Sequence, residues 1–258
     1  LNENSKSQSK KNIEYHYDLG NKFYTQWLDS SMTYSSAYFE KENDNLFDAQ
    51  LNKYQKIAES LNLNENSQVL EIGCGWGGFS TYAAKNFKSK IDAITISKAQ
   101  FEYASNKIQK EGLGEKVSIK FKDYRDIDSQ YSNIASIEMF EAVGRKYWEK
   151  YFDVVKNSLV NSGKAALQII TIDEKRSFNY QSQPDFIQQY IFPGGMLPTK
   201  KELLEINQKV GLDFSEIKSN DLELLILAFV LFAFIGIVLF TIFTVIRAKS
   251  SAKVGLPV

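Results

Sequence analysis

Cysteine is nearly absent from this chain of 258 residues, which contains only Cys74. A single cysteine excludes an internal disulfide and fits a reducing compartment. Net charge is also absent, because 31 Lys and Arg residues balance 31 Asp and Glu residues. A nucleic-acid-binding protein needs a basic face to meet phosphates, so we expect no nucleic-acid partner. Residues 1–12 are rich in Asn, Lys, Ser and Gln and have no apolar run, so we expect a disordered head and no secretory signal there.

Charged residues are absent between residues 224 and 246, where Leu, Ile, Phe, Val and Ala predominate. As a helix this stretch is about 35 Å long, against a hydrocarbon core of about 30 Å. The alternative is a buried core helix, but such helices usually keep a polar face over this length. The pattern therefore favours a transmembrane helix over residues 222–247, followed by a basic tail, 248–258.

Apolar runs alternate with helical patterns through the middle of the chain. We expect strands at residues 69–72, 91–96, 117–121, 134–137, 165–172 and 212–217. Between them we expect helices at residues 79–87, 98–111 and 146–158, and one more that ends near residue 210. This alternation predicts an α/β domain, residues 61–220, with a doubly wound parallel sheet.

A glycine turn, GCGWGG, follows the first predicted strand at residues 73–78. Gly73, Gly75 and Gly78 match the dinucleotide pattern G-x-G-x-x-G, which is a weak signal by itself. Glu71 precedes this turn, and an acid there repels phosphate but suits a ligand that carries an ammonium and a sulfonium. The second strand ends in residues 95–97 without the acid that would hold the ribose of a nicotinamide cofactor. The alternative is a glycine turn that serves packing only.

Asp123 and Tyr124 follow the third predicted strand. A carboxylate there can accept a hydrogen bond from an adenine amino group, and an aromatic ring can flank the base. The alternative for Asp123 is an ordinary turn-forming aspartate.

Longer strings resemble the cyclopropane-fatty-acid synthase family: YHYDLGNKFY (15–24), MTYSSAYF (32–39), VLEIGCGWGG (69–78), SIEMFE (136–141) and YIFPGGMLP (190–198). The resemblance runs from about residue 13 to residue 219. It implies a Rossmann-like class I methyltransferase fold with a mostly parallel sheet. It also implies methyl transfer from S-adenosyl-L-methionine to the double bond of an acyl chain in a membrane phospholipid. The helical segment 13–60 would then cover the substrate and the cofactor.

The resemblance, together with the arguments above for Glu71 and Asp123, also indicates which residues bind the cofactor. They are Tyr34, Ser35, Glu71, Gly73, Cys74, Gly75, Trp76, Gly77, Gly78, Thr95, Ile96, Ser97, Gln100, Asp123, Tyr124 and Arg125. We expect no metal site.

An alkene is a weak nucleophile, and its methylation leaves a carbocation, so the site needs aromatic faces and a base. The family is understood to hold a bicarbonate as that base. Its ligands fall on Glu141 and the Ile137 backbone, and on cysteine and histidine positions that are Ser36 and Gln168 here. Serine and glutamine can still hydrogen-bond an anion, but these departures leave open a methyl-branched rather than a cyclopropane product. His16 lies in a family string as a catalytic candidate, and the alternative is a structural histidine.

The tail departs most from the family, which continues after Ser219 with helices that carry a tyrosine ligand and then a final antiparallel strand. Here the apolar run follows, so we expect a sheet that lacks its last strand and a C-terminal apolar helix. Either the domain ends early and is anchored by this helix, or the reading frame shifts near residue 219. The positive-inside rule places the basic tail in the cytoplasm. The cofactor requires the catalytic domain there too, but one span cannot place both in the cytoplasm. Because long domains translocate poorly, we give the cofactor precedence and expect a cytoplasmic domain that associates with the membrane. The rival functions are methylation of another small hydrophobic molecule and an inactive, truncated cofactor-binding domain.

Overall fold

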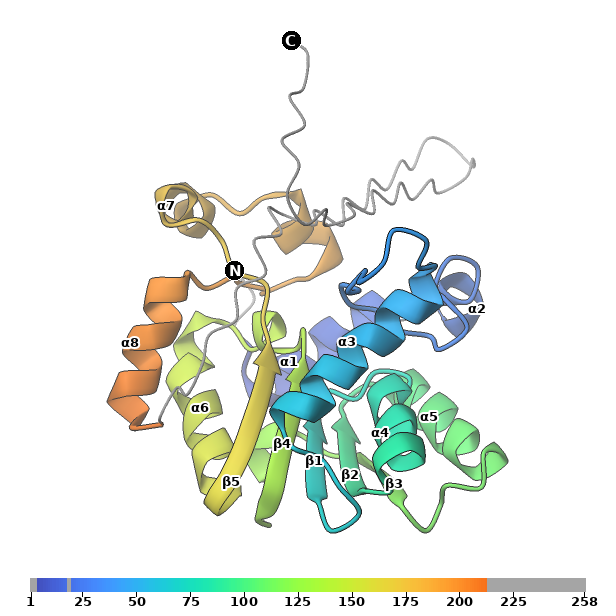
Figure 1. Ribbon diagram of the computed structural model, residues 1–258. Helices are drawn as coiled ribbons and strands as arrows, with labels where there is room; N and C mark the ends of the chain where they lie inside the picture. The colour runs from blue at the N-terminus through green and yellow to red at the C-terminus, as the bar shows by residue number, and fades with distance from the viewer. Residues whose placement is uncertain (1–3, 18–19, 213–258) are drawn as a thin grey trace.

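A five-stranded sheet forms the centre of the molecule, with helices on both of its faces (Figure 1). The computed structural model describes residues 4–17 and 20–212. Its strands are β1 (Gln68–Ile72), β2 (Lys90–Thr95), β3 (Val117–Phe121), β4 (Tyr131–Ile137) and β5 (Leu159–Gln168). The strand order is β3-β2-β1-β4-β5, and every neighbouring pair is parallel. The predicted doubly wound parallel sheet is confirmed.

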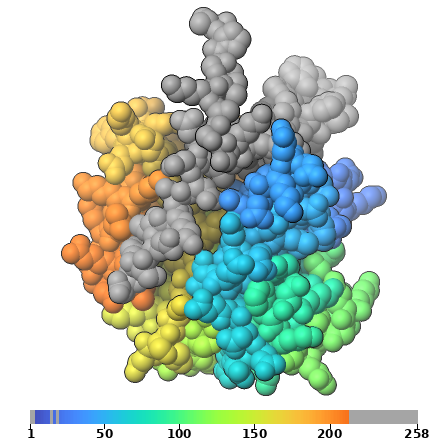
Figure 2. All heavy atoms as spheres, in the orientation of Figure 1, coloured from blue at the N-terminus to red at the C-terminus, as the bar shows by residue number. Residues whose placement is uncertain are grey.

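Successive residues of the central strand, β1, pack in two separate hydrophobic cores, because side chains alternate between the two faces of a strand. Val69 packs in the core formed with α3 (Leu46–Ser60), α4 (Gly78–Phe87) and α5 (Lys98–Lys110). Leu70 packs on the other face, with α6 (Trp148–Asn157) and α8 (Lys200–Val210). In the space-filling view, α3 lies directly beside α4 on the first of these faces (Figure 2).

The chain reverses its winding direction between β1 and β4, which are neighbours in the sheet although two strands separate them in sequence. Ligands of open parallel sheets bind beside the carboxyl ends of the strands at such a point. Here Gly73 follows β1 and Glu138 follows β4. The elements α2 (Asn21–Tyr24) and α7 (Glu174–Ser182) lie beyond this edge of the sheet (Figure 1). The remaining short helices are η1 (Tyr124–Asp126), η2 (Phe140–Ala142), η3 (Arg145–Tyr147) and η4 (Ile187–Ile191).

The N-terminal segment is ordered, and the expectation of a disordered head over residues 1–12 is wrong from Asn4 onward. Helix α1 runs from Lys6 to Tyr17, and Asn4 and Asn12 are buried. The Nδ2 atom of Asn4 donates to the Gly194 carbonyl at 2.8 Å, and Nδ2 of Asn12 donates to Asn4 Oδ1 at 2.7 Å. Polar side chains therefore order this segment by satisfying one another against the rest of the domain.

The strand β5 begins and ends earlier than the expected range 165–172. The chain leaves the sheet at Gln168, and the Ile172 N–H donates to the Pro198 carbonyl at 2.9 Å instead. The predicted strand at 212–217, except Leu212, the predicted span 222–247 and the basic tail lie outside the described residues. Within residues 4–17 and 20–212, the helices are too short or too polar to cross a membrane.

Candidate active site

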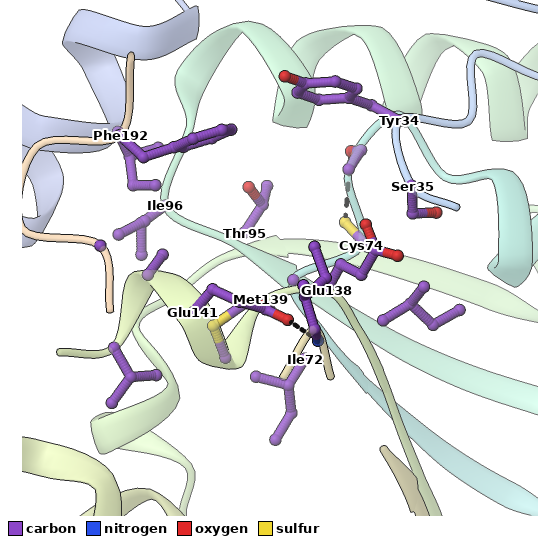
Figure 3. Close-up of a pocket in the computed structure, with 18 of the residues that line it drawn as sticks. Tyr34, Ser35, Ile72, Cys74, Thr95, Ile96, Glu138, Met139, Glu141 and Phe192 are labelled. Carbon is purple, nitrogen blue, oxygen red and sulfur yellow. Dashed lines mark hydrogen bonds between the residues drawn. The ribbon is translucent and has the colours of Figure 1, made fainter. Parts of the chain in front are cut away.

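A cavity of about 430 Å³ opens at the carboxyl ends of the strands (Figure 3). Its walls come from α1, the loop before α3, the glycine turn and the residues after β2, β3, β4 and β5. Of the predicted site residues, the following line it: Tyr34, Ser35, Ser36, Glu71, Gly73, Cys74, Gly75, Trp76, Gly78, Thr95, Ile96, Gln100, Asp123, Tyr124, Arg125, Ile137 and Glu141. The size suits a small-molecule site.

Two glycines of the turn are needed for different reasons. Gly73 has φ +81°, and a Cβ there would lie 2.5 Å from Cγ of Met139, so the turn packs closely on the residues after β4. Gly75 has φ +52°, and a Cβ there would meet nothing within 4 Å. Packing therefore accounts for Gly73, whereas Gly75 leaves room for a ligand to approach the backbone.

Glu71 lies in β1 just before the glycine turn and is 2% exposed. Its Oε2 atom accepts a hydrogen bond from the Ser80 hydroxyl on α4. Burial raises the pKa of Glu71 to about 7. A carboxyl that titrates near neutral pH at the wall of the cavity favours a positively charged group on a ligand.

Thr95 at the end of β2 and Gln100 in α5 both line the cavity, and Thr95 Oγ1 donates a hydrogen bond of 2.9 Å to Gln100 Oε1. Ser97 is the N-cap of α5 and accepts from the Gln100 N–H at 3.3 Å. Gly77 is the N-cap of α4. Neither Ser97 nor Gly77 is among the residues that line the cavity.

Asp123 forms a turn and also lines the cavity. Its Oδ1 accepts from the backbone N–H and Nε of Arg125, at 2.9 and 2.8 Å, and its Oδ2 accepts from Nη2 at 2.7 Å. Arg125 also donates from Nη1 to the Asn4 carbonyl at 3.1 Å. Asp123 therefore forms the turn of the alternative reading, and its role toward an adenine stays a prediction. The hydrogen bond from Arg125 to the Asn4 carbonyl ties the cavity wall to the segment before α1.

His16 lies behind the aromatic wall of the cavity rather than in it. Its ring stacks on Tyr34 with centroids 5.8 Å apart and contacts Phe192 at 4.1 Å, and both of these residues line the cavity. Its Nδ1 is 2.8 Å from the Ile191 carbonyl oxygen, and burial lowers the pKa of His16 to about 4. A neutral ring that donates to a carbonyl fits the structural alternative.

Glu138 is the residue on which two predicted anion ligands converge. Its Oε1 accepts from the Ser36 backbone N–H at 2.9 Å and from Nε2 of Gln168 at 2.7 Å. Gln168 does not itself line the cavity, whereas Glu138 does. Glu138 has φ +48°, an unusual backbone conformation for a residue with a side chain.

Glu141 lies one short turn after Glu138 (Figure 3). Its Oε1 accepts from the Ile170 N–H, while its buried Oε2 has no hydrogen-bond partner among the described residues. Burial, and then the charge of Glu138, raises the pKa of Glu141 to about 8. The cavity thus holds a pair of acids in which Glu141 keeps its proton at neutral pH.

Sequence reasoning missed two charged residues here, Glu138 and Lys53. The Nζ atom of Lys53 donates to Ser35 Oγ at 2.5 Å, and burial lowers the pKa of Lys53 to about 7. The sequence does carry a signal for it, because Lys53 occupies the face of α3 that also buries Ala49 and Tyr54. For Glu138 the signal is a second acid at the end of the predicted strand 134–137.

The strand order and the glycine turn at the switch point define a class I S-adenosylmethionine-dependent methyltransferase fold. A crystal structure of mycolic acid cyclopropane synthase CmaA1, complexed with SAH and CTAB, superposes with a TM-score of 0.75. It is 27% identical, and the match covers 80% of this chain and 76% of that one.

The chain belongs to the mycolic acid cyclopropane synthetase family, whose sequence model matches residues 4–224. It is 40% identical over 193 residues to cyclopropane-fatty-acyl-phospholipid synthase of Escherichia coli, a match that covers 75% of this chain and 48% of the relative. It is 36% identical over 218 residues to tuberculostearic acid methyltransferase UfaA1 of Mycobacterium tuberculosis, covering 81% of this chain and 51% of the relative. The chain therefore spans about half the length of these curated relatives.

Proposed function

We propose that the chain binds S-adenosyl-L-methionine in this cavity and transfers its methyl group to the double bond of an unsaturated phospholipid acyl chain. The observation that carries the proposal is a single cavity that joins a glycine turn beside Glu71 to an apolar wall. The aromatic ring of Tyr34 and the acids Glu138 and Glu141 line the same cavity.

The residues present fit S-adenosyl-L-methionine. Gly75 leaves open space beside the turn, and Glu71 favours a cationic ligand. Thr95 and Gln100 offer polar atoms to a ribose at the end of β2. When bound, the cofactor supplies a methyl group on a sulfonium, which is electrophilic enough for an alkene.

The apolar part of the cavity lining suits an acyl chain. Its apolar lining residues are Ile13, Val143, Ile170, Ile172, Ile187, Phe192, Met196 and Leu197. Burial of a hydrocarbon chain here is favourable by about 0.8 kcal/mol for each CH₂ group. The role of this wall is to bind and orient the alkene and to exclude water from the carbocation.

The reaction needs two further contributions from the chain. The π electrons of the alkene would form a bond to the methyl carbon as its bond to sulfur breaks and S-adenosylhomocysteine leaves, and a positive charge would develop on the neighbouring alkene carbon. Tyr34 and Phe192 line the cavity with their rings stacked 6.4 Å apart, and aromatic rings stabilise a nearby cation. A base must then remove a proton. Loss of the proton from the new methyl group closes a cyclopropane ring. Loss of a proton from a carbon of the chain instead leaves a methyl-branched chain with a double bond.

The methyl-branched product is a second candidate, since one relative is named as a tuberculostearic acid methyltransferase. We also propose that segment 13–60 covers both ligands and that residues 222–247 hold the enzyme at a cytoplasmic membrane surface. A phospholipid substrate supports this, because tethering raises its effective concentration.

Purified full-length chain, methyl-labelled S-adenosylmethionine and vesicles test the proposal. Label should enter the acyl chains of unsaturated phosphatidylglycerol but not those of the saturated lipid. Label in neither lipid, from protein that binds the cofactor, would leave methylation of another small hydrophobic molecule. The same result would also fit the inactive, cofactor-binding alternative, whereas absence of cofactor binding would contradict the proposal itself.

A further inference from the structure

We propose that the carboxylate of Glu138 takes the place of the bicarbonate base, so that this chain supplies its own proton acceptor. The inference rests on the proposed methyl transfer. It starts from a disagreement between the ligands expected for bicarbonate and the contacts that these residues make.

The donors expected to hold bicarbonate are already directed at a protein carboxylate. Ser36 donates from its backbone N–H and Gln168 donates from Nε2, and both hydrogen bonds end on Oε1 of Glu138. The Glu138 N–H in turn donates to the Gln168 carbonyl at 2.9 Å. A second anion at this point would lose both donors and would lie beside a like charge.

The backbone holds Glu138 in this position. The register of β4 and β5 pairs Ile137 with Gln168. The side chains of Gln168 and of Glu138, the residue after Ile137, therefore meet where the strands end. Beyond β4 the chain enters φ +48° at Glu138. Because non-glycine residues adopt this conformation only where surrounding contacts compensate, the geometry points to a carboxylate whose position matters.

The neighbouring groups suit a base. Lys53 is 4% exposed and its charge interacts favourably with that of Glu138, while Glu141 stays protonated beside it. The step balances within the chain. A C–H bond of the methylated lipid breaks, its electrons form the new C–C or C=C bond, and the proton moves to a Glu138 oxygen and then to water.

Two variants of Glu138 distinguish a base that belongs to the chain from a bound bicarbonate. Glu138→Gln keeps the volume and removes the base, whereas Glu138→Gly removes the carboxylate, opens its space and suits the positive φ. Glu141→Gln is the matched control, because an amide resembles a protonated carboxyl.

Lipid methylation is measured in carbon-dioxide-free buffer and after addition of bicarbonate. We expect wild-type turnover to be the same in both. Glu138→Gln should lose about 100-fold or more in both, and Glu138→Gly should lose as much but recover about tenfold with bicarbonate or formate. Glu141→Gln should lose much less than Glu138→Gln. Wild-type turnover that rises with bicarbonate, or a Glu138→Gln variant close to wild type, would overturn the proposal.

Binding is measured as well, so that the inference can fail independently of the proposed function. Carbon-13 NMR of labelled bicarbonate, with S-adenosylhomocysteine present, should show binding to Glu138→Gly and none to wild type. Equal binding to both would contradict the inference even if neither protein methylates lipid. Wild-type protein that binds no bicarbonate and methylates no lipid would instead count against the proposed function.

Discussion

Gln168 at the end of β5 donates a hydrogen bond of 2.7 Å from Nε2 to Oε1 of Glu138, which follows β4. The two residues are 30 positions apart in sequence. Parallel pairing of β4 and β5 brings them together at the edge of the sheet where the cavity opens. The contact connects the framework of the fold to the acid proposed as the base.

Replacing Gln168 tests this connection. Gln168→Leu removes one of the two donors to Glu138 Oε1, so the carboxylate is held less well. We expect kcat to fall about tenfold while the affinity for S-adenosylmethionine stays unchanged. Gln130→Leu, at an exposed position before β4, is the control and should leave both values unchanged. Steady-state kinetics and calorimetric titration measure the two effects; an unchanged kcat in Gln168→Leu would contradict the role.

Gly75 should be required for the ligand rather than for the fold. Gly75→Ala and Gly112→Ala place a Cβ at similar positive φ values, +52° and +68°, with open space around both. Each should lose about 1–2 kcal/mol of stability through backbone strain. Only Gly75→Ala should also weaken S-adenosylmethionine binding, since Gly112 lies in a remote turn after α5. Thermal melts and calorimetry compare the two variants. Equal affinities of both variants for S-adenosylmethionine would show that the turn is not part of the binding site.

The raised pKa of Glu141 predicts how the stability of the folded protein depends on pH. Its pKa is raised from 4.5 to about 8 in the folded protein. The stability that it contributes is therefore present below about pH 4.5 and is lost as pH rises through 8. We expect the wild-type Tm to fall from pH 6 to pH 9 more steeply than that of Glu141→Gln, which cannot ionise. Parallel Tm profiles would show that Glu141 is not protonated in the fold.

His16 is the only histidine in the sequence, so its ring can be followed without assignment. Burial lowers its pKa from 6.5 to about 4. Its contribution to stability is present above about pH 6.5 and is lost as pH falls through 4. The Hε1 proton signal should show no titration near pH 6.5 while the chain stays folded. A midpoint near 6.5 would place His16 in solvent and contradict the aromatic wall described here.

The parallel sheet could be predicted because apolar strand runs and turn residues are local signals. The glycine turn after β1 could be predicted as well, since Gly73, Gly75 and Gly78 are close in sequence. The order of the N-terminal segment was not. Asn4 is fixed by a hydrogen bond to Gly194, 190 residues away, and nothing in the polar composition around it records that contact.

The same limit applied to the site. Ser36 and Gln168 were identified as anion ligands, but the anion that they bind in the structure is Glu138, a residue of the chain itself. That assignment depends on the register of β4 against β5 and on the backbone turn at Glu138, which sequence spacing does not specify.

The central claim is that this chain methylates unsaturated acyl chains of phospholipids. The most direct test is lipid analysis of a bacterial host that makes unsaturated phospholipids and lacks an enzyme of this family. Cells that express the full chain receive methionine with a deuterated methyl group, and Glu138→Gln serves as the inactive control. We predict acyl chains with one added carbon that carries deuterium, in place of part of the unsaturated pool, and none in the control. An unchanged acyl profile, with folded protein that binds S-adenosylmethionine, would contradict the claim.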